Sequence, residues 1–160
     1  MQHPEPFFTF AVPGVPRPQG SMTLTRHPSG ATSARYSKHV YAWRTMMTDR
    51  ILIEAESNPF DKRPNQPIGV GATFMLPRPK NHYRTGKYAN ELKAGAPDRP
   101  TGRTGDLDKL VRALLDSITD SGIVWTDDAQ VVLISANKIY CVDDVGPGVW
   151  VQLFEEGRML

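Results

Sequence analysis

The stretch GDLDKLVRALLDSITDSGIVWTDDAQ, residues 105–130, decides how the rest of the chain is interpreted. Its apolar residues recur at steps of three and four, which predicts a helix with one buried stripe. The stripe consists of Leu107, Leu110, Val111, Leu114, Leu115 and Ile118. Asp108, Arg112 and Asp116 follow at steps of four and therefore share a second, polar face. Ser121-Gly122 is expected to end the helix, because glycine readily adopts the left-handed conformation common at helix C-termini.

Two pairs of carboxylates flank this predicted helix. Asp106 and Asp108 stand at its start, and Asp127 and Asp128 follow the turn after its end. We expect the two pairs to meet near one helix end, where carboxylates repel one another unless protons or a cation neutralise them. Oxygen ligands favour Mg²⁺, Mn²⁺ or Ca²⁺ over Zn²⁺, and Mg²⁺ commonly pairs with phosphate oxygens. The alternatives are an Asp-x-Asp that is only a solvated N-cap and an Asp-Asp that is only a turn.

Length and cysteine content restrict the classes of protein that fit. The 160 residues suit one domain, which we take as 1–160, with a basic loop at 77–104 and an acidic motif at 105–132. Cys141 stands alone, so an intrachain disulfide and a cysteine-based zinc site are excluded, and a reducing compartment is expected. The start of the chain does not resemble a signal peptide, and no apolar run approaches a membrane span. We therefore expect a cytoplasmic protein with no membrane partner; the resemblance described below implies a bacterial or phage-infected bacterial cell.

Charge is unevenly distributed along the chain. The first 105 residues carry fifteen lysines and arginines against seven acidic residues, whereas the last 55 carry four against ten. A basic front and an acidic back suit a protein that grips a polyanion with one part and holds cations with another. Solvated surfaces alone also produce such an imbalance.

Two polar segments carry the basic residues that we predict to contact DNA. The first spans residues 17–38, and the second is the long loop 77–104, in which aromatic residues alternate with cations. Such mixtures suit phosphate contacts combined with base or sugar stacking, although a solvated loop without function is the alternative. The predicted DNA-binding residues are Arg17, Arg35, Lys38, Arg78, Lys80, Arg84, Lys87 and Arg103.

The remaining pattern predicts an α+β domain. A helix is expected from residue 36 or 38 to about Ser57, in addition to the helix after Gly105. Strands are expected at 7–12, 68–76, 123–125, 129–139 and 148–154. The β-α-β-α-β-β order predicts a single domain with a small mixed or antiparallel sheet and two main helices on one face. Lys138 ends the fourth of these strands and points either toward the acidic site or to water. Trp43, Trp125 and Trp150 are expected in the core.

The run at 105–132 resembles the RusA-type Holliday junction resolvases, small endonucleases common in phages and prophages. Their signature is an Asp-x-Asp-Asn leading a helix, a Lys and then an Asp at successive turns, and an Asp-Asp-Ala-Gln-Val strand. Residues 10–21, FAVPGVPRPQGS, are more loosely similar to the first strand and loop of that family, and the strand ending at Lys138 also fits.

The resemblance implies specific roles. In that family three aspartates bind Mg²⁺ or Mn²⁺ within a homodimer that nicks two opposed strands of a four-way junction. By position these are Asp106, Asp108 and Asp128, with Asp127 at the neighbouring acidic position. Asp116 matches the aspartate further along the helix. Two residues depart from the signature: Lys109 replaces its Asn and Arg112 replaces its Lys, which puts the charge-stabilising role in question.

The expected function is therefore a metal-dependent endonuclease that resolves branched DNA. Mg²⁺, or Mn²⁺, activates water, and Arg112 or Lys109 offsets charge on the phosphate. No small-molecule cofactor is expected. The alternatives are a broader nuclease of forks and flaps and a junction-binding protein with weak or lost catalysis. A purely structural domain ranks last, because a structural role does not explain the presence of the acidic pairs and the basic loop.

Overall fold

A four-stranded mixed sheet forms the base of the molecule in this computed structural model, which describes residues 5–101, 105–142 and 144–155. The strands lie in the order β1-β6-β4-β5. Their bounds are β1 (Phe8–Pro13), β4 (Ile68–Leu76), β5 (Val131–Tyr140) and β6 (Gly148–Glu155). β6 pairs antiparallel with both β1 and β4, whereas β4 and β5 run parallel. β5 is thus an outer strand of the sheet, and the predicted α+β class is confirmed.

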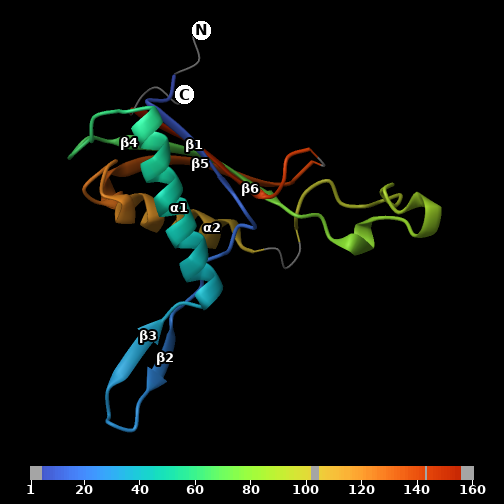
Figure 1. The fold of residues 1–160 in the computed structure, drawn as a ribbon, viewed down its shortest axis with the longest axis horizontal. Coiled ribbons are helices and arrows are strands. Elements are labelled where there is room, and N and C mark those ends of the chain that lie inside the picture. The colour runs from blue at the N-terminus through green and yellow to red at the C-terminus, as the bar shows by residue number, and fades with distance from the viewer. Residues whose placement is uncertain (1–4, 102–104, 143, 156–160) are drawn as a thin grey trace.

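Two helices cover one face of this sheet (Figure 1). The Ser37 side chain accepts a hydrogen bond from the Val40 backbone N–H at the start of α1 (Lys38–Ser57). The second helix, α2 (Leu107–Ser121), ends at Gly122, whose φ of 70° is the left-handed conformation that the sequence predicts. Among the described residues, no helix is both long and apolar enough to cross a membrane.

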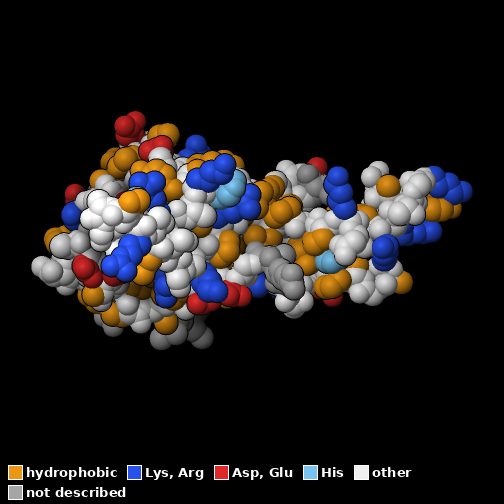
Figure 2. Space-filling model, turned by 90° about the horizontal axis from the view of Figure 1, so that it is seen from below, with side chains coloured by type: hydrophobic (Ala, Val, Ile, Leu, Met, Phe, Trp, Pro, Cys, Tyr) orange, Lys and Arg blue, Asp and Glu red, His pale blue; other side chains and the backbone are white. Residues whose placement is uncertain are grey.

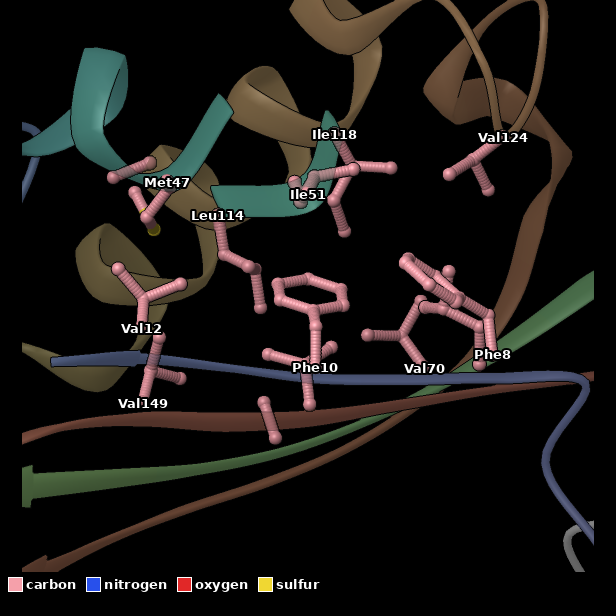
Figure 3. Close-up of a cluster of buried hydrophobic side chains, with 14 of the residues drawn as sticks. Phe8, Phe10, Val12, Met47, Ile51, Val70, Leu114, Ile118, Val124 and Val149 are labelled. Atoms are coloured by element: carbon pink, nitrogen blue, oxygen red, sulfur yellow. The ribbon is translucent and has the colours of Figure 1, made fainter. Parts of the chain in front are cut away.

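The core lies between the helices and the sheet (Figure 3). Met47 and Ile51 of α1 and Leu114 of α2 meet strand residues such as Phe10 and Val70, all of them fully buried. Burial of this kind is the main favourable contribution to folding, and it fixes α2 over the sheet. The acidic residues at both ends of α2 are therefore attached to a rigid element.

Two details of the prediction are wrong. Residues 123–125 form no strand; Val124 and Trp125 lie buried in an irregular connection between α2 and β5. The Trp125 indole N–H donates to the Thr119 hydroxyl at 2.8 Å, which holds this turn under the helix. Trp43 and Trp125 belong to the core as expected, but Trp150 is 43 % exposed.

Two segments project from the body (Figure 1). The hairpin of β2 (Thr23–Arg26) and β3 (Thr32–Arg35) connects β1 to α1 in the sequence, and nearly all its side chains are exposed. The second projection, residues 77–101, is called the arm here; it leaves the end of β4 and contains the short turns η1 (Lys80–His82) and η2 (Gly86–Tyr88). A β-bridge joins Tyr83 to Leu92 across the arm. This part of the predicted loop is therefore folded.

Candidate functional site

The first acidic pair lies at the start of α2. Asp106 occupies the N-cap position with extended backbone, but its carboxylate accepts no capping hydrogen bond from the helix. The carboxylate instead accepts a hydrogen bond from the Lys109 ammonium at 2.6 Å and remains 66 % exposed. Asp108 lies in the first turn of the helix with an exposed side chain. Asp106 is therefore an exposed N-cap residue, as the alternative interpretation expects, but its carboxylate is bonded to Lys109 and does not cap the helix.

Neighbouring cations favour the ionised form of Asp106. The hydrogen bond from Lys109 and its charge hold the pKa of Asp106 below its ordinary value, and Lys138 adds a smaller effect in the same direction. The same contact raises the pKa of Lys109. Asp106 is therefore an anion throughout the neutral range and is available as a ligand for a cation.

Three segments far apart in sequence converge on the start of α2. The Lys138 ammonium, near the end of β5, donates to the Gly105 carbonyl at 2.9 Å. Gly105 has a φ of +106°, and a Cβ there would lie 3.1 Å from the Pro18 ring, so a side chain is excluded. The Gln19 backbone N–H donates to the Lys109 carbonyl at 3.0 Å. Lys138 thus lies at the site and does not simply point into water.

Asp116 belongs to a different group of contacts. It lies in the second half of α2, where its carboxylate accepts a 2.5 Å hydrogen bond from the side-chain amide of Gln19 and lies 3.3 Å from Arg44. Arg44 also pairs with Asp120. Gln19 is 1 % exposed, so its amide needs these partners. Asp116 therefore ties α2 to α1 and to the loop after β1. Gln19 was not predicted, and no sequence pattern marks it.

The second acidic pair lies beyond the other end of α2. The Asp127 carboxylate accepts a 2.7 Å hydrogen bond from the Ala129 N–H and thereby caps the turn η3 (Asp128–Gln130). The Gln130 amide fastens this turn to the Arg63 and Gln66 carbonyls. Asp128 is exposed, and its carboxylate has no bonded partner within the described part of the chain. The turn interpretation is therefore correct for Asp127, whereas Asp128 is free.

The two acidic pairs do not meet within one chain. The fifteen residues of α2 span about 22 Å, with Asp106 at one end and η3 packed near the other. β5 then runs from η3 back to Lys138 beside Gly105. No group of three or more potential metal ligands forms among the residues that the structure describes. The expectation that all four aspartates gather at one helix end is wrong for a single chain, because β5 begins where α2 ends.

The arm carries four of the predicted DNA-binding residues. Arg78 donates to the Pro97 carbonyl at 2.7 Å and stacks on Tyr140 at 4.2 Å, which fixes the base of the arm. Arg84 lies 4.0 Å from the Tyr88 ring and pairs with Glu91. Lys80 and Lys87 are exposed. Figure 2 shows lysine and arginine side chains along this projection. Arg103 lies outside the described residues.

The other predicted DNA-binding residues lie on the body. Arg35 and Lys38 are exposed where the hairpin joins α1. Arg17 is exposed and lines a hollow of about 340 Å³ that also includes Gly105. Arg112, one turn after Asp108, is exposed as well. The start of α2 is therefore surrounded by cations from the loop after β1, from α2 and from β5.

Comparisons with known proteins bear on this arrangement. The family model of Endodeoxyribonuclease RusA matches residues 13–153, a range that contains the hairpin, the arm, both helices and both acidic pairs. A comparison with curated proteins gave no match. The matched range covers nearly the whole chain. The protein therefore belongs to the RusA endodeoxyribonuclease family and is a nuclease that acts on DNA.

Proposed function

We propose that this nuclease resolves four-way DNA junctions by metal-dependent nicking of two opposed strands. The observation that carries the proposal is the start of α2, where exposed Asp106 and Asp108 lie among Lys109, Arg112 and Lys138 on a chain of this family. Carboxylates beside cations suit a phosphodiester substrate, because the first hold a metal and the second offset phosphate charge.

A single chain does not by itself fit the expected metal site. Each end of α2 offers one pair of carboxylates, and no larger group of ligands is found among the described residues. Two chains would supply a fuller set if the Asp127-Asp128 pair of one approached Asp106 and Asp108 of the other. The resemblance to the resolvases implies a homodimer, and a two-fold dimer matches the symmetry of a four-way junction.

The chain's own residues have distinct parts in this proposal. Asp106, Asp108 and Asp128 would hold Mg²⁺ or Mn²⁺ as hard oxygen ligands, and the ion would supply activation of water for attack on the phosphodiester. The planar guanidinium of Arg112 suits stabilisation of charge on the phosphate oxygens and not proton donation. Lys109 provides a second positive charge beside the same carboxylates.

The hairpin and the arm bind DNA in this proposal. Exposed Lys80 and Lys87 of the arm, with Arg35 and Lys38 at the base of the hairpin, are placed to contact phosphates away from the scissile bond. Contacts of this kind release counterions, so the affinity should fall steeply with salt. The branched substrate is selected by the spacing of these contacts.

The test is cleavage of a synthetic four-way junction compared with linear duplex, fork and flap substrates. Reactions contain Mg²⁺, Mn²⁺ or EDTA. Paired, symmetric nicks that require metal and spare the duplex are expected. Efficient cutting of forks and flaps would establish the broader nuclease, and cutting in EDTA would contradict the metal.

One residue favours a second candidate function. Arg112 stands where the family signature has lysine, and a junction-binding protein with weak catalysis would result if an ammonium were required there. Tight junction binding without cleavage is the outcome that identifies this function. Arg112→Lys should then restore cutting.

A further inference from the structure

The base of the hairpin is fastened to both helices by one buried amide. The chain enters the hairpin after Gln19 and leaves it at Tyr36, and the Gln19 amide donates to the Tyr36 hydroxyl at 3.3 Å. The same amide donates to the Asp116 carboxylate of α2 at 2.5 Å. The side-chain oxygen of Gln19 accepts from the Arg44 guanidinium of α1 at 3.3 Å. Both ends of the hairpin therefore meet at a single polar cluster.

Apolar packing does not fix the direction of the hairpin within the described part of the chain. β2 and β3 pair with each other and not with the four-stranded sheet, and they project from the body (Figure 1). Seven of their eight side chains are exposed. Gln19 is buried, so its amide requires hydrogen-bond partners, and hydrogen bonds are directional. The contacts of Gln19 therefore set the angle at which the hairpin leaves the body.

Gln19 is also attached close to the first acidic pair. Its backbone N–H donates to the carbonyl of Lys109, three residues after Asp106. Its side chain reaches Asp116 further along the same helix. Gln19 thus contacts α2 at two places, so the orientation of the loop on the helix is fixed as well as its position. The hairpin and the carboxylates at the start of α2 are linked through this one residue.

We propose that Gln19 and Asp116 are positioning residues that hold the hairpin at a fixed angle to the carboxylates at the start of α2. Arg35 and Lys38, at the base of the hairpin, then contact phosphates at a fixed distance from the scissile bond. The inference rests on the proposed function in one respect, since it takes the hairpin as part of the DNA-binding surface. Neither positioning residue touches the reacting phosphate. Fixed spacing favours nicking, because a small misplacement of a substrate strongly lowers its rate of reaction.

Exchanging the two side chains tests this role. Gln19→Glu keeps the shape of the side chain but places a second carboxylate beside Asp116, and the two repel. Adding Asp116→Asn supplies an amide donor, so the hydrogen bond forms again in the reverse direction. Arg44 then faces the carboxylate at position 19 in place of the one at 116, and the net charge of the cluster is unchanged. Gln19→Glu alone should release the hairpin, and the double variant should hold it.

Spin labels measure the position of the hairpin without any reaction. The labels are attached at Ser29→Cys in the hairpin turn and at Glu56→Cys near the end of α1, both exposed, on a Cys141→Ser background. Labelled chain is diluted with unlabelled chain, so that only distances within one chain are observed. Pulsed electron paramagnetic resonance should give a narrow distance distribution for the parent, a broad one with Gln19→Glu and a narrow one again for the double variant. A narrow distribution with Gln19→Glu alone would overturn the proposal.

Nicking of a four-way junction connects this position to the reaction. Gln19→Glu should lower kcat by about tenfold or more, and the double variant should recover most of the lost rate. Mn²⁺ affinity should stay unchanged in both, which a general loss of structure would not allow. Gln152→Glu is the matched control and should nick at the wild-type rate. Gln152 alternates along β6 with the core residues Val151 and Leu153, so it lies on the face of the sheet away from the helices.

The two measurements separate this inference from the proposed function. If the wild type cuts no junction, the proposed function fails, and the distance distributions still decide whether Gln19 and Asp116 hold the hairpin. If the wild type cuts and Gln19→Glu cuts equally fast with a broadened distribution, the proposed function stands and the positioning role is overturned. Should Gln19→Glu fail to fold, the double variant decides. Recovery of folding, distance and rate supports the proposal, and a double variant that does not recover them overturns it.

Discussion

The two ends of α2 carry the same residue type in the same number, yet their carboxylates are held in different ways. At the start, Asp106 is bonded to the Lys109 side chain and Asp108 is exposed. Beyond the other end, Asp127 is bonded to the Ala129 backbone and Asp128 is exposed. Each pair therefore has one hydrogen-bonded carboxylate and one exposed carboxylate. The bonded carboxylates differ in their donor, which is a side chain for Asp106 and the backbone for Asp127.

That difference bears on which carboxylates could serve as ligands in the proposed metal site. A lysine side chain is long and flexible, so an arriving cation can displace it from Asp106. The bond from Ala129 to Asp127 is part of the turn η3, and breaking it leaves a backbone N–H without its cap. In the proposed metal site, Asp106 would become a ligand once the metal ion displaces Lys109, whereas the Asp127 carboxylate remains bonded within η3. The spacing of the four aspartates gives no hint of this division.

The largest expected effect comes from Asp108→Asn. The substitution keeps the shape of the side chain and removes a charge that has no bonded partner within the described part of the chain. Junction cleavage should fall by at least about a hundredfold, while binding of the junction persists. Initial rates with Mg²⁺ and a gel-shift titration measure the two properties. A variant that cuts at the wild-type rate would remove Asp108 from the site.

The second pair allows a direct comparison of its two members. Asp128→Asn should reduce cleavage as strongly as Asp108→Asn, whereas Asp127→Asn should cut at close to the wild-type rate. An asparagine at 127 still accepts the hydrogen bond from Ala129, and so preserves η3. Asp127→Ala, which cannot accept it, should lower stability by about 1 kcal/mol. Equal loss of activity in both Asn variants would show that Asp127 is a ligand.

Most of the fold can be predicted from the sequence, but the different bonding of the carboxylates at the two ends of α2 cannot. The apolar periodicity correctly places α2, and Gly122 marks its end. The expectation that Asp127 lies near Asp106 is wrong, and the length of the connection after α2 already excludes it. Only five residues separate Ser121 from Asp127, and six extended steps reach about 20 Å at most. A connection that also turns and buries Val124 and Trp125 cannot return along a 22 Å helix.

Other features depend on contacts that no local pattern contains. Gln19 is bonded to Asp116, ninety-seven residues away, and only the packing of the loop after β1 against α2 brings them together. Residues 123–125 have strand-like composition, but burial beneath α2 overrides that preference. The order inside the arm comes from Arg84, Tyr88 and Glu91, whose contacts arise once the chain has turned. Side-chain roles at the site share this dependence on tertiary structure.

A smaller effect is expected from the arm, which leaves β4 at the end where α2 starts. Lys80→Ala with Lys87→Ala removes two exposed charges and should weaken junction binding. If each contacts one phosphate, the slope of log affinity against log salt should become shallower by about two. Lys62→Ala is the control, because Lys62 lies in the connection at the opposite end of β4, near η3. An unchanged slope in the double variant would exclude the arm from the interface.

The smallest expected effect comes from Lys109→Asn. This variant tests whether Asp106, which is bonded to Lys109, binds a metal ion more readily when the lysine is removed. The lysine occupies one oxygen of Asp106 and repels any cation that approaches it. The asparagine found in the family signature cannot repel, so Mn²⁺ should bind several-fold more tightly, as expected for loss of one nearby unit charge. Titration calorimetry at constant ionic strength measures the change, with Lys93→Asn on the arm as a control of equal charge. Metal affinity that does not rise would mean that Asp106 keeps its lysine when the ion binds. The site would then depend on Asp108 and Asp128, the two carboxylates that are free at either end of the helix.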